Sequence, residues 1–170
     1  IEKELNIYNR KTAEVAQELG IKFLALGNQP FSTYSNIKII PKERYKFMTD
    51  WCVENNIDAL MVAHQADDQI ETFLMNLSRG SGVNGLSAIQ PESYRDGVKI
   101  VRPLLGVFRS ELLKYCDDNH IKYFWDEMND DEQYTRVRIR KNRRFLAEKL
   151  GIDDSRILLA IENLGRVRDT

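Results

Sequence analysis

The sequence has little cysteine and histidine, and this scarcity excludes several kinds of site. Its 170 residues include only two cysteines and two histidines. Cys52 and Cys116 lie far apart and form no C-x-x-C pair, so they are predicted to be reduced core residues rather than a disulfide. With two histidines in the whole chain and no cysteine close to His64, a zinc site is not expected.

Long apolar runs are absent as well. No run approaches the roughly 20 apolar residues that a membrane-spanning helix needs, so no membrane segment is expected. The opening residues Ile1-Glu2-Lys3-Glu4-Leu5-Asn6 resemble neither the basic nor the apolar part of an export signal. The sequence therefore predicts a cytoplasmic protein.

Excess charge of one sign is missing overall but present locally. The formal net charge is −1. Five acids nevertheless occur among residues 126–132, and six basic residues follow among residues 136–144. The basic cluster is compatible with nucleic-acid binding, although the net charge alone would argue against it.

Helical and strand patterns alternate over the first two-thirds of the chain, which indicates an α/β fold with a parallel sheet. Helices are predicted over residues 10–19, 41–54 and 110–119, and strands over residues 21–26, 57–63, 98–101 and 121–124. A further helix is marked by an apolar stripe of Ile70, Phe73, Leu74 and Leu77. From about Tyr134 the chain is predicted to be helical. We expect an α/β domain over residues 1–125 and a helical, basic segment over residues 126–170.

The segment after the apolar run 57–63 carries the strongest candidates for chemistry. Asp67 and Glu71 share one helix face, Asp68 lies at its edge, and His64 precedes them. Ligands bind at this end of the strands in open α/β sheets. The carboxylates could hold Mg²⁺, orient an amine or act as a base. Alternatively, Asp67 and Asp68 only favour the helix dipole, and His64 is a strand-end residue.

Two further segments suit anions. Glycines in Arg79-Gly80-Ser81-Gly82 let backbone N–H groups approach an anion, although an ordinary helix stop explains them as well. Arg136 and Arg140 share a helix face, and Arg143 and Arg144 extend it, which suits phosphates along a nucleic-acid backbone. Salt bridges with the acids just upstream are the alternative.

Taken together, the segments resemble the lysidine synthetase family of N-type ATP pyrophosphatases, the PP-loop enzymes. The resemblance covers nearly the whole chain and is densest from Arg44 to Arg140. His64 to Thr72 resembles the family's A-H-x-x-D-D-x-x-E-T, and Arg79 to Leu86 resembles R-G-S-G-x-x-G-L. Arg44-Tyr45 resembles the family's R-Y. Arg102-Pro103-Leu104-Leu105, with Arg109 and Glu111-Leu112, resembles R-P-L-L…R-x-E-L. Asp126 to Arg140 resembles D-x-S-N-x-D-x-x-Y-x-R-N-x-I-R.

The resemblance implies an activity. ATP would adenylate the C2 oxygen of the wobble cytidine in the tRNA(Ile) anticodon stem-loop, and free L-lysine would displace AMP to give lysidine. It implies catalytic roles for His64, Asp67, Asp68 and Glu71, with Mg²⁺ at Asp68. Substrate- or tRNA-binding roles are implied for Arg79, Gly80, Ser81, Gly82, Arg102, Arg109, Asp126, Asn129, Asp131, Arg136 and Arg140. A homodimer is left open.

The sequence also departs from the family pattern. The S-G-G-x-D-S loop that grips the ATP pyrophosphate is absent, so the chain is expected to lack its first strand and this loop. Gln65, Met128 and Val137 replace residues that are common in the family. Two alternatives stay open: a related tRNA thiolase, which normally needs a C-x-x-C pair, and an inactive RNA-binding fragment.

Overall fold

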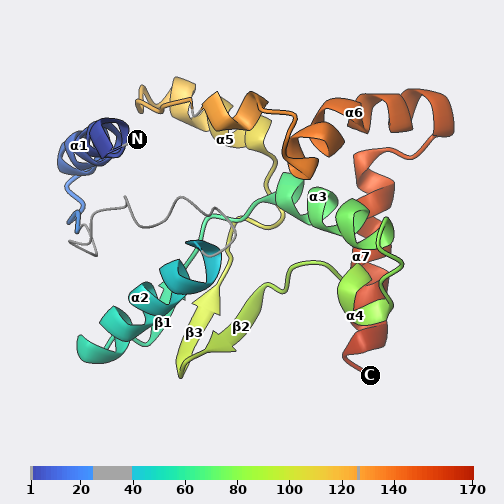
Figure 1. The fold of residues 1–170 in the computed structure, drawn as a ribbon, viewed down its shortest axis with the longest axis horizontal. Coiled ribbons are helices and arrows are strands. Elements are labelled where there is room, and N and C mark those ends of the chain that lie inside the picture. The colour runs from blue at the N-terminus through green and yellow to red at the C-terminus, as the bar shows by residue number, and fades with distance from the viewer. Residues whose placement is uncertain (1, 25–39, 126) are drawn as a thin grey trace. The chain divides into compact units, whose positions relative to one another are not determined.

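The computed structural model describes residues 2–24, 40–125 and 127–170. Helices and short strands alternate through the first part, and helices alone follow (Figure 1). In chain order the elements are α1 (Glu2–Glu18), α2 (Ile40–Glu54), β1 (Ala59–Met61), α3 (Ala66–Leu77), α4 (Val83–Leu86), β2 (Glu92–Arg95), β3 (Val98–Val101), α5 (Arg109–Asp118), the 3₁₀ helix η2 (Glu127–Asp130), α6 (Thr135–Leu150) and α7 (Asp154–Arg168). The predicted α/β class with a helical C-terminal segment is confirmed.

The three strands form one sheet in the order β1-β3-β2. Asp96 and Gly97 join β2 to β3, and both have positive φ angles, of 49° and 82°. Two such residues form the tight turn of an antiparallel hairpin. The β1 side is parallel, because Val62 N bonds to Val101 O and Ala66 N to Val107 O, so the partners advance together along the chain. The sheet is therefore mixed rather than wholly parallel.

Three strand predictions need correction. Residues 21–24 and 121–124 form no strand, while residues 25–26 lie outside the described part. Ile21 and Tyr123 are 61% and 46% exposed. In the described residues neither segment lies beside another strand with which it could form backbone hydrogen bonds. An apolar pattern in the sequence does not show whether such a neighbouring strand exists. The strand predicted over residues 57–63 shortens to Ala59–Met61. It lies at an edge of the sheet with Met61 72% exposed, so it is not buried on both faces.

Contacts divide the chain into two compact units. One comprises Ile1–Leu60 with Tyr94–Ile100, and the other Met61–Ser93 with Val101–Thr170. In the first unit, Thr49 is fully buried, and its hydroxyl bonds to the Asp96 carboxylate at 3.3 Å. The Arg95 guanidinium lies 4.9 Å from the centre of the Tyr45 ring. The functional division at residue 125 stays a prediction.

The core of the second unit lies where α3 meets α7. Ile70 of α3 packs with Ile157 and Ile161 of α7, and Phe73 and Leu74 flank them. The predicted α3 stripe is confirmed except at Leu77, which is 51% exposed. α3 also contacts α6 and α4. Its apolar side is thus fixed against α7, which leaves its acidic residues to meet α6.

The C-terminal segment is helical, as predicted, and consists of the two helices α6 and α7. Gly151 ends α6 with a φ of 64°, a left-handed conformation that favours glycine. Asp153 begins α7 by accepting a hydrogen bond from Arg156 N at 2.9 Å. None of the described helices is both long and apolar enough to cross a membrane.

Candidate active site

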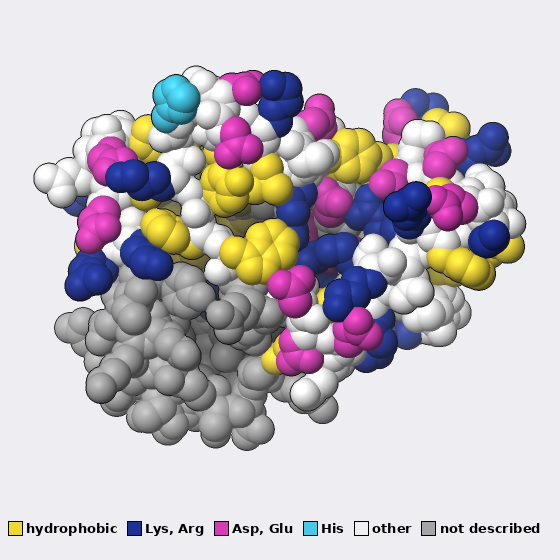
Figure 2. Space-filling model, turned by 90° about the horizontal axis from the view of Figure 1, so that it is seen from above, with side chains coloured by type: hydrophobic (Ala, Val, Ile, Leu, Met, Phe, Trp, Pro, Cys, Tyr) yellow, Lys and Arg dark blue, Asp and Glu magenta, His cyan; other side chains and the backbone are white. Residues whose placement is uncertain are grey.

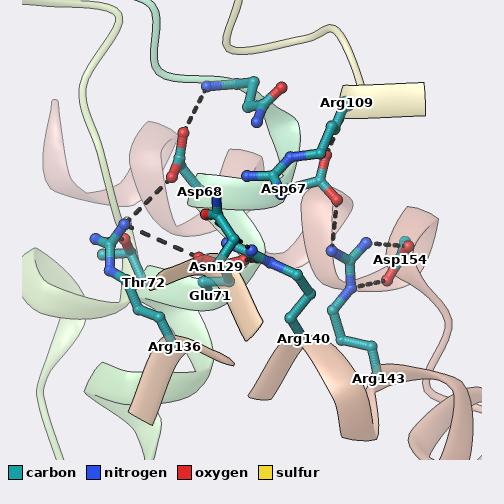
Figure 3. Close-up of polar contacts among 11 residues, drawn as sticks. Asp67, Asp68, Glu71, Thr72, Arg109, Asn129, Arg136, Arg140, Arg143 and Asp154 are labelled. Carbon is teal, nitrogen blue, oxygen red and sulfur yellow. Dashed lines mark hydrogen bonds and ion pairs between the residues drawn. The ribbon is translucent and has the colours of Figure 1, made fainter. Parts of the chain in front are cut away.

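The candidate site lies within the second unit, along the side of α3 that faces α6 (Figure 3). Asp67 and Asp68 stand in the first turn of α3, and Glu71 follows one turn later. Arg136, Arg140 and Arg143 are spaced four and three residues apart on α6, which places them on one helix face. Each of the three acids is paired with one of these arginines. The sequence predicted each face but not their contact.

Asp67 joins three helices. Its Oδ2 accepts a hydrogen bond from Arg109 N at 2.8 Å, at the first residue of α5. Its Oδ1 accepts one from Arg143 Nη1 at 2.7 Å. Burial raises the pKa of Asp67, but the Arg109 amide and the Arg143 guanidinium outweigh it, so the pKa lies below its ordinary value. With both oxygens bonded and a lowered pKa, Asp67 is better suited to positioning than to accepting a proton.

Asp68 also has both oxygens engaged. Its Oδ2 accepts a hydrogen bond from Gln65 N at 3.0 Å, which caps the start of α3. Its Oδ1 accepts one from Arg136 Nη1 at 3.2 Å. Arg136 also donates to the Thr72 hydroxyl at 3.3 Å and remains 44% exposed. Part of the helix-end alternative is therefore observed, since Asp68 does cap its own helix.

Glu71 differs from both aspartates. Its side chain is fully buried, and Oε1 accepts a hydrogen bond from Arg140 Nε at 2.8 Å. Oε2 is buried without a hydrogen-bond donor, and its nearest cation is Arg136 Nη1 at 3.9 Å. A buried carboxylate oxygen without a donor is unfavourable unless something else satisfies it. Among the six oxygens of the three acids, Glu71 Oε2 is the one that could receive a substrate group.

Arg143 and Asp154 were not among the predicted site residues. Arg143 reaches Asp67 on α3 and forms a two-pronged pair with Asp154 at the start of α7. Burial lowers the pKa of Arg143, but its hydrogen bonds with Asp154 and Asp67 outweigh this and raise it. The arginine spacing places Arg143 on the face of Arg136 and Arg140 but does not predict its contacts with Asp67 and Asp154. Nothing in the sequence singled out Asp154.

A magnesium ion does not fit the side chains as they stand. Five of the six carboxylate oxygens already accept hydrogen bonds from N–H groups. No group of three His, Cys, Asp or Glu side chains in the described residues is arranged to hold a metal. Binding at Asp68 would require Arg136 to leave Oδ1. The Mg²⁺ assignment stays a prediction.

The glycine-rich segment forms the turn between α3 and α4. Gly80 has a φ of 68°, and Gly82 immediately precedes α4. A Cβ atom on Gly85 would lie 2.7 Å from the Cβ of Ser81, so the backbone approaches Ser81 more closely than any other residue would allow. Asn76 Nδ2 fixes this turn by donating to Gly85 O at 2.7 Å. Arg79 is exposed beside it.

Replacing Gly85 with alanine is expected to lower the free energy of unfolding by about 1–3 kcal/mol, the usual range for an overpacked methyl group. Urea unfolding of the purified chain measures it. In a Ser81→Gly background the clashing Cβ is gone, so the same substitution should be much less harmful. An equal loss in both backgrounds would show that the Ser81 contact is not the cause.

The other predicted residues are placed as follows. Arg102 follows β3, and its Nη1 donates to Gln90 O at 2.9 Å and to Ser93 Oγ at 3.0 Å. Asn129 Oδ1 lies 3.5 Å from Arg140 Nη1, which adds η2 to the site. Asp131 Oδ1 accepts from Gln133 N just before α6. His64 is half-buried ahead of α3, and Asp126 lies outside the described residues.

Comparison with known proteins places the chain in a family. The PP-loop domain, an ATP-binding family, matches residues 6–144, which include all three acids and all three arginines. The chain belongs to the PP-loop domain family. The PP-loop family predicted from the five sequence motifs is thereby confirmed.

Similar curated proteins are tRNA(Ile)-lysidine synthases. The chain is 41% identical to that of Wolbachia pipientis over 79% of its own length, and 40% identical to that of Ruegeria pomeroyi over 75%. It is 35% identical to that of Zymomonas mobilis over 82%. These matches cover 33%, 30% and 46% of the relatives, so the chain spans only a third to a half of their length.

A solved structure shares the PP-loop fold. A U34-tRNA thiolase from Methanococcus maripaludis, determined with its [4Fe–4S] cluster, superposes with a TM-score of 0.69. The match covers 90% of this chain and 54% of the thiolase at 18% sequence identity. At this identity the likeness supports the fold.

Proposed function

We propose that this PP-loop domain is part of a tRNA(Ile)-lysidine synthase that ligates L-lysine to C2 of the wobble cytidine of tRNA(Ile). The similar proteins bear that name. The observation that carries the proposal is the row of three carboxylates on α3 facing three arginines on α6, within the matched residues. The row presents one buried oxygen, Glu71 Oε2, with no donor of its own.

The proposed reaction has two steps. The C2 oxygen attacks the α-phosphorus of ATP and pyrophosphate leaves, which gives an adenylated tRNA. The ε-ammonium of lysine first gives a proton to Glu71 Oε2, because a buried carboxylate attracts a cation strongly and can accept its proton. The resulting amine attacks C2, AMP leaves with the oxygen, and the new C–N nitrogen releases its second proton to solvent.

Access to Glu71 depends on Arg136. Arg136 is 44% exposed, and its contacts with Asp68, Thr72 and Glu71 are long, at 3.2, 3.3 and 3.9 Å. These contacts are weak enough to be exchanged for a substrate phosphate. Movement of Arg136 toward the RNA would then open Oε2 to lysine. Arg140 is held more firmly, at 2.8 Å from Glu71, and keeps the carboxylate oriented.

The remaining predicted residues serve substrate binding in this proposal. Arg79 with Gly80, Ser81 and Gly82 offers a charged turn, and the Arg109 side chain stands beside Asp67 (Figure 3). ATP is the nucleotide expected of the family, while Mg²⁺, His64 as a catalytic group, a homodimer and a cytoplasmic location stay predictions.

A thiolase is the alternative within the superfamily. Its fold is the same, but its chemistry normally needs paired cysteines, and the chain's two cysteines are 64 positions apart in sequence. Cys52 is also buried. An inactive RNA-binding fragment is the other alternative. The buried Glu71 argues against it, because an unpaired carboxylate oxygen destabilises the fold and has no use in a dead site.

Incubation of the full-length protein with a tRNA(Ile) transcript, ATP and radiolabelled lysine tests the proposal. We expect lysine to enter the RNA, and AMP to be released in equal amount. A transcript with uridine in place of the wobble cytidine is the matched control and should take up no lysine. Sulfur transfer to the RNA, or RNA binding without lysine incorporation, would contradict the proposal and favour one of the two alternatives.

A further inference from the structure

An exposed tryptophan lies beside the candidate site and has no role in the proposed reaction. Trp125 is 51% exposed although tryptophan is a large apolar side chain. It ends a run of three exposed aromatic residues, with Tyr123 at 46% and Phe124 at 41%. On the face seen in Figure 2, hydrophobic side chains lie among Lys, Arg, Asp and Glu side chains. Exposed aromatic rings are the stacking platforms of surfaces that bind single-stranded nucleic acid.

The Trp125 ring is held at its edge. The indole Nε1 donates a hydrogen bond to Asp130 Oδ2 at 2.8 Å. Asp130 is in turn fixed to α6, because Lys141 Nζ donates to its carbonyl oxygen at 3.3 Å. A bond at the ring edge fixes the indole orientation without engaging the ring face. The ring is therefore pre-oriented, which lowers the entropy lost when a flat group binds on it.

The same short segment reaches the catalytic candidates. Asn129 is the residue before Asp130, and it contacts Arg140, whose Nε bonds to Glu71 at 2.8 Å. Trp125 is thus connected to Glu71 through Asp130, Asn129 and Arg140. Arg138 of α6 is exposed and bonds to two backbone carbonyls and the Thr135 hydroxyl, so its charge is suited to an RNA backbone. Lys141 and Arg144 are exposed too, but they pair with Glu132 and Glu148.

We propose that Trp125 stacks on the base of an unpaired nucleotide next to the one that reacts, in the loop of an RNA hairpin. The inference rests on the proposed function for the identity of the RNA. The aromatic face supplies stacking, and the basic α6 supplies charge complementarity. A base within a duplex is already stacked on both faces and would not engage the ring.

The chain offers a direct probe, because Trp51 and Trp125 are its two tryptophans. In a Trp51→Phe variant of the 170-residue chain, fluorescence reports on Trp125 alone. We expect an anticodon stem-loop RNA of tRNA(Ile) to quench this fluorescence, and a fully paired duplex of equal length to leave it nearly unchanged. Equal quenching by both RNAs, or none by the stem-loop, would overturn the proposal.

Substitutions at Trp125 separate stacking from folding. Trp125→Leu should weaken stem-loop binding about tenfold or more, as expected for loss of one stacked base, whereas Trp125→Phe should retain most of the affinity. Phe145→Leu removes a different exposed aromatic side chain, on α6, and should have no effect on stem-loop binding. Circular dichroism spectra check that the variants fold. Equal affinity of Trp125→Leu and Trp125→Phe would refute stacking.

Lysine incorporation by the full-length protein tests base stacking on Trp125 separately from lysidine formation. With Trp125→Leu, KM for tRNA should rise about tenfold with kcat little changed, since the ring binds RNA without touching the reacting atoms. Incorporation with unaltered KM would leave the function standing and refute the role of Trp125. Selective quenching without any incorporation would refute lysidine formation and leave base stacking intact.

Discussion

Replacing Glu71 with glutamine is expected to lower lysidine formation by about a hundredfold or more, the scale typical of losing a positioned acid–base group. Glutamine keeps the shape of the side chain and an oxygen that can accept from Arg140 Nε, but it removes the charge on Oε2. Lysine incorporation under single-turnover conditions measures the effect. The adenylation step should be less affected, so the adenylated tRNA intermediate should accumulate.

The matched control is Glu132→Gln. Glu132 also pairs with a cation of α6, Lys141 at 2.7 Å, but it is 62% exposed and does not contact the three acids of α3. We expect normal lysine incorporation from this variant. If Glu71→Gln retained full incorporation, with no more than a lowered melting temperature, the acceptor role of Glu71 would be wrong and its pair with Arg140 would be structural.

Replacing Asp67 with asparagine is expected to lower the free energy of unfolding at neutral pH by about 1–3 kcal/mol, the usual range for hydrogen bonds to charged groups. Asp67 accepts from Arg109 N and from Arg143, and its side chain is 16% exposed. The variant would weaken the attachment of both α5 and α6 to α3. Urea unfolding of both proteins over a series of pH values measures the difference.

The pH dependence follows from the sign of the pKa shift. The pKa of Asp67 in the folded chain lies below its ordinary value of 3.8, since the hydrogen bonds from Arg109 and Arg143 outweigh burial. Its contribution to stability is therefore complete above the ordinary value and is lost as the pH falls through the lower, folded value. The difference in free energy of unfolding between wild type and Asp67→Asn should accordingly become smaller only when the pH falls below about 3.8.

Asp118→Asn is the control for this experiment. Asp118 is the last residue of α5, and it pairs with Lys114 as an exposed i, i+4 pair. Its removal should leave the acid dependence of stability unchanged. A gap between wild type and Asp67→Asn that stayed constant into acid would show that the lost interaction does not depend on the charge of Asp67.

Helical periodicity predicted the fold better than strand patterns did. The stripe of α3 identified Ile70, Phe73 and Leu74 because a helix face depends on nearby residues. Strands depend on partners distant in sequence, and the apolar patterns at residues 21–24 and 121–124 had none in the described chain. β2 was missed because Glu92–Arg95 is polar, although Asp96-Gly97 is a recognised hairpin signal.

The candidate site shows the same limit. Local spacing predicted that Asp67 and Glu71 share a face, and that Arg136 and Arg140 share another. Their hydrogen bonds join positions 68 to 76 residues apart, for which the sequence carries no local signal. The acids just upstream were the alternative partners for the arginines. In the described residues one of them, Glu132, does pair with α6, but through Lys141.

The two ion pairs of Arg143 link the local unfolding of α7 to the acids of the site. It connects Asp67 on α3 with Asp154 at the start of α7, and α7 also packs Ile157 and Ile161 against Ile70. The family match ends at residue 144, before α7 begins. Local unfolding of α7 would uncover the α3 core and free Arg143 from Asp154 together, so we expect α7 and the acids to unfold as one cooperative foldon. Amide hydrogens of α7 should then exchange with solvent in step with those around the site.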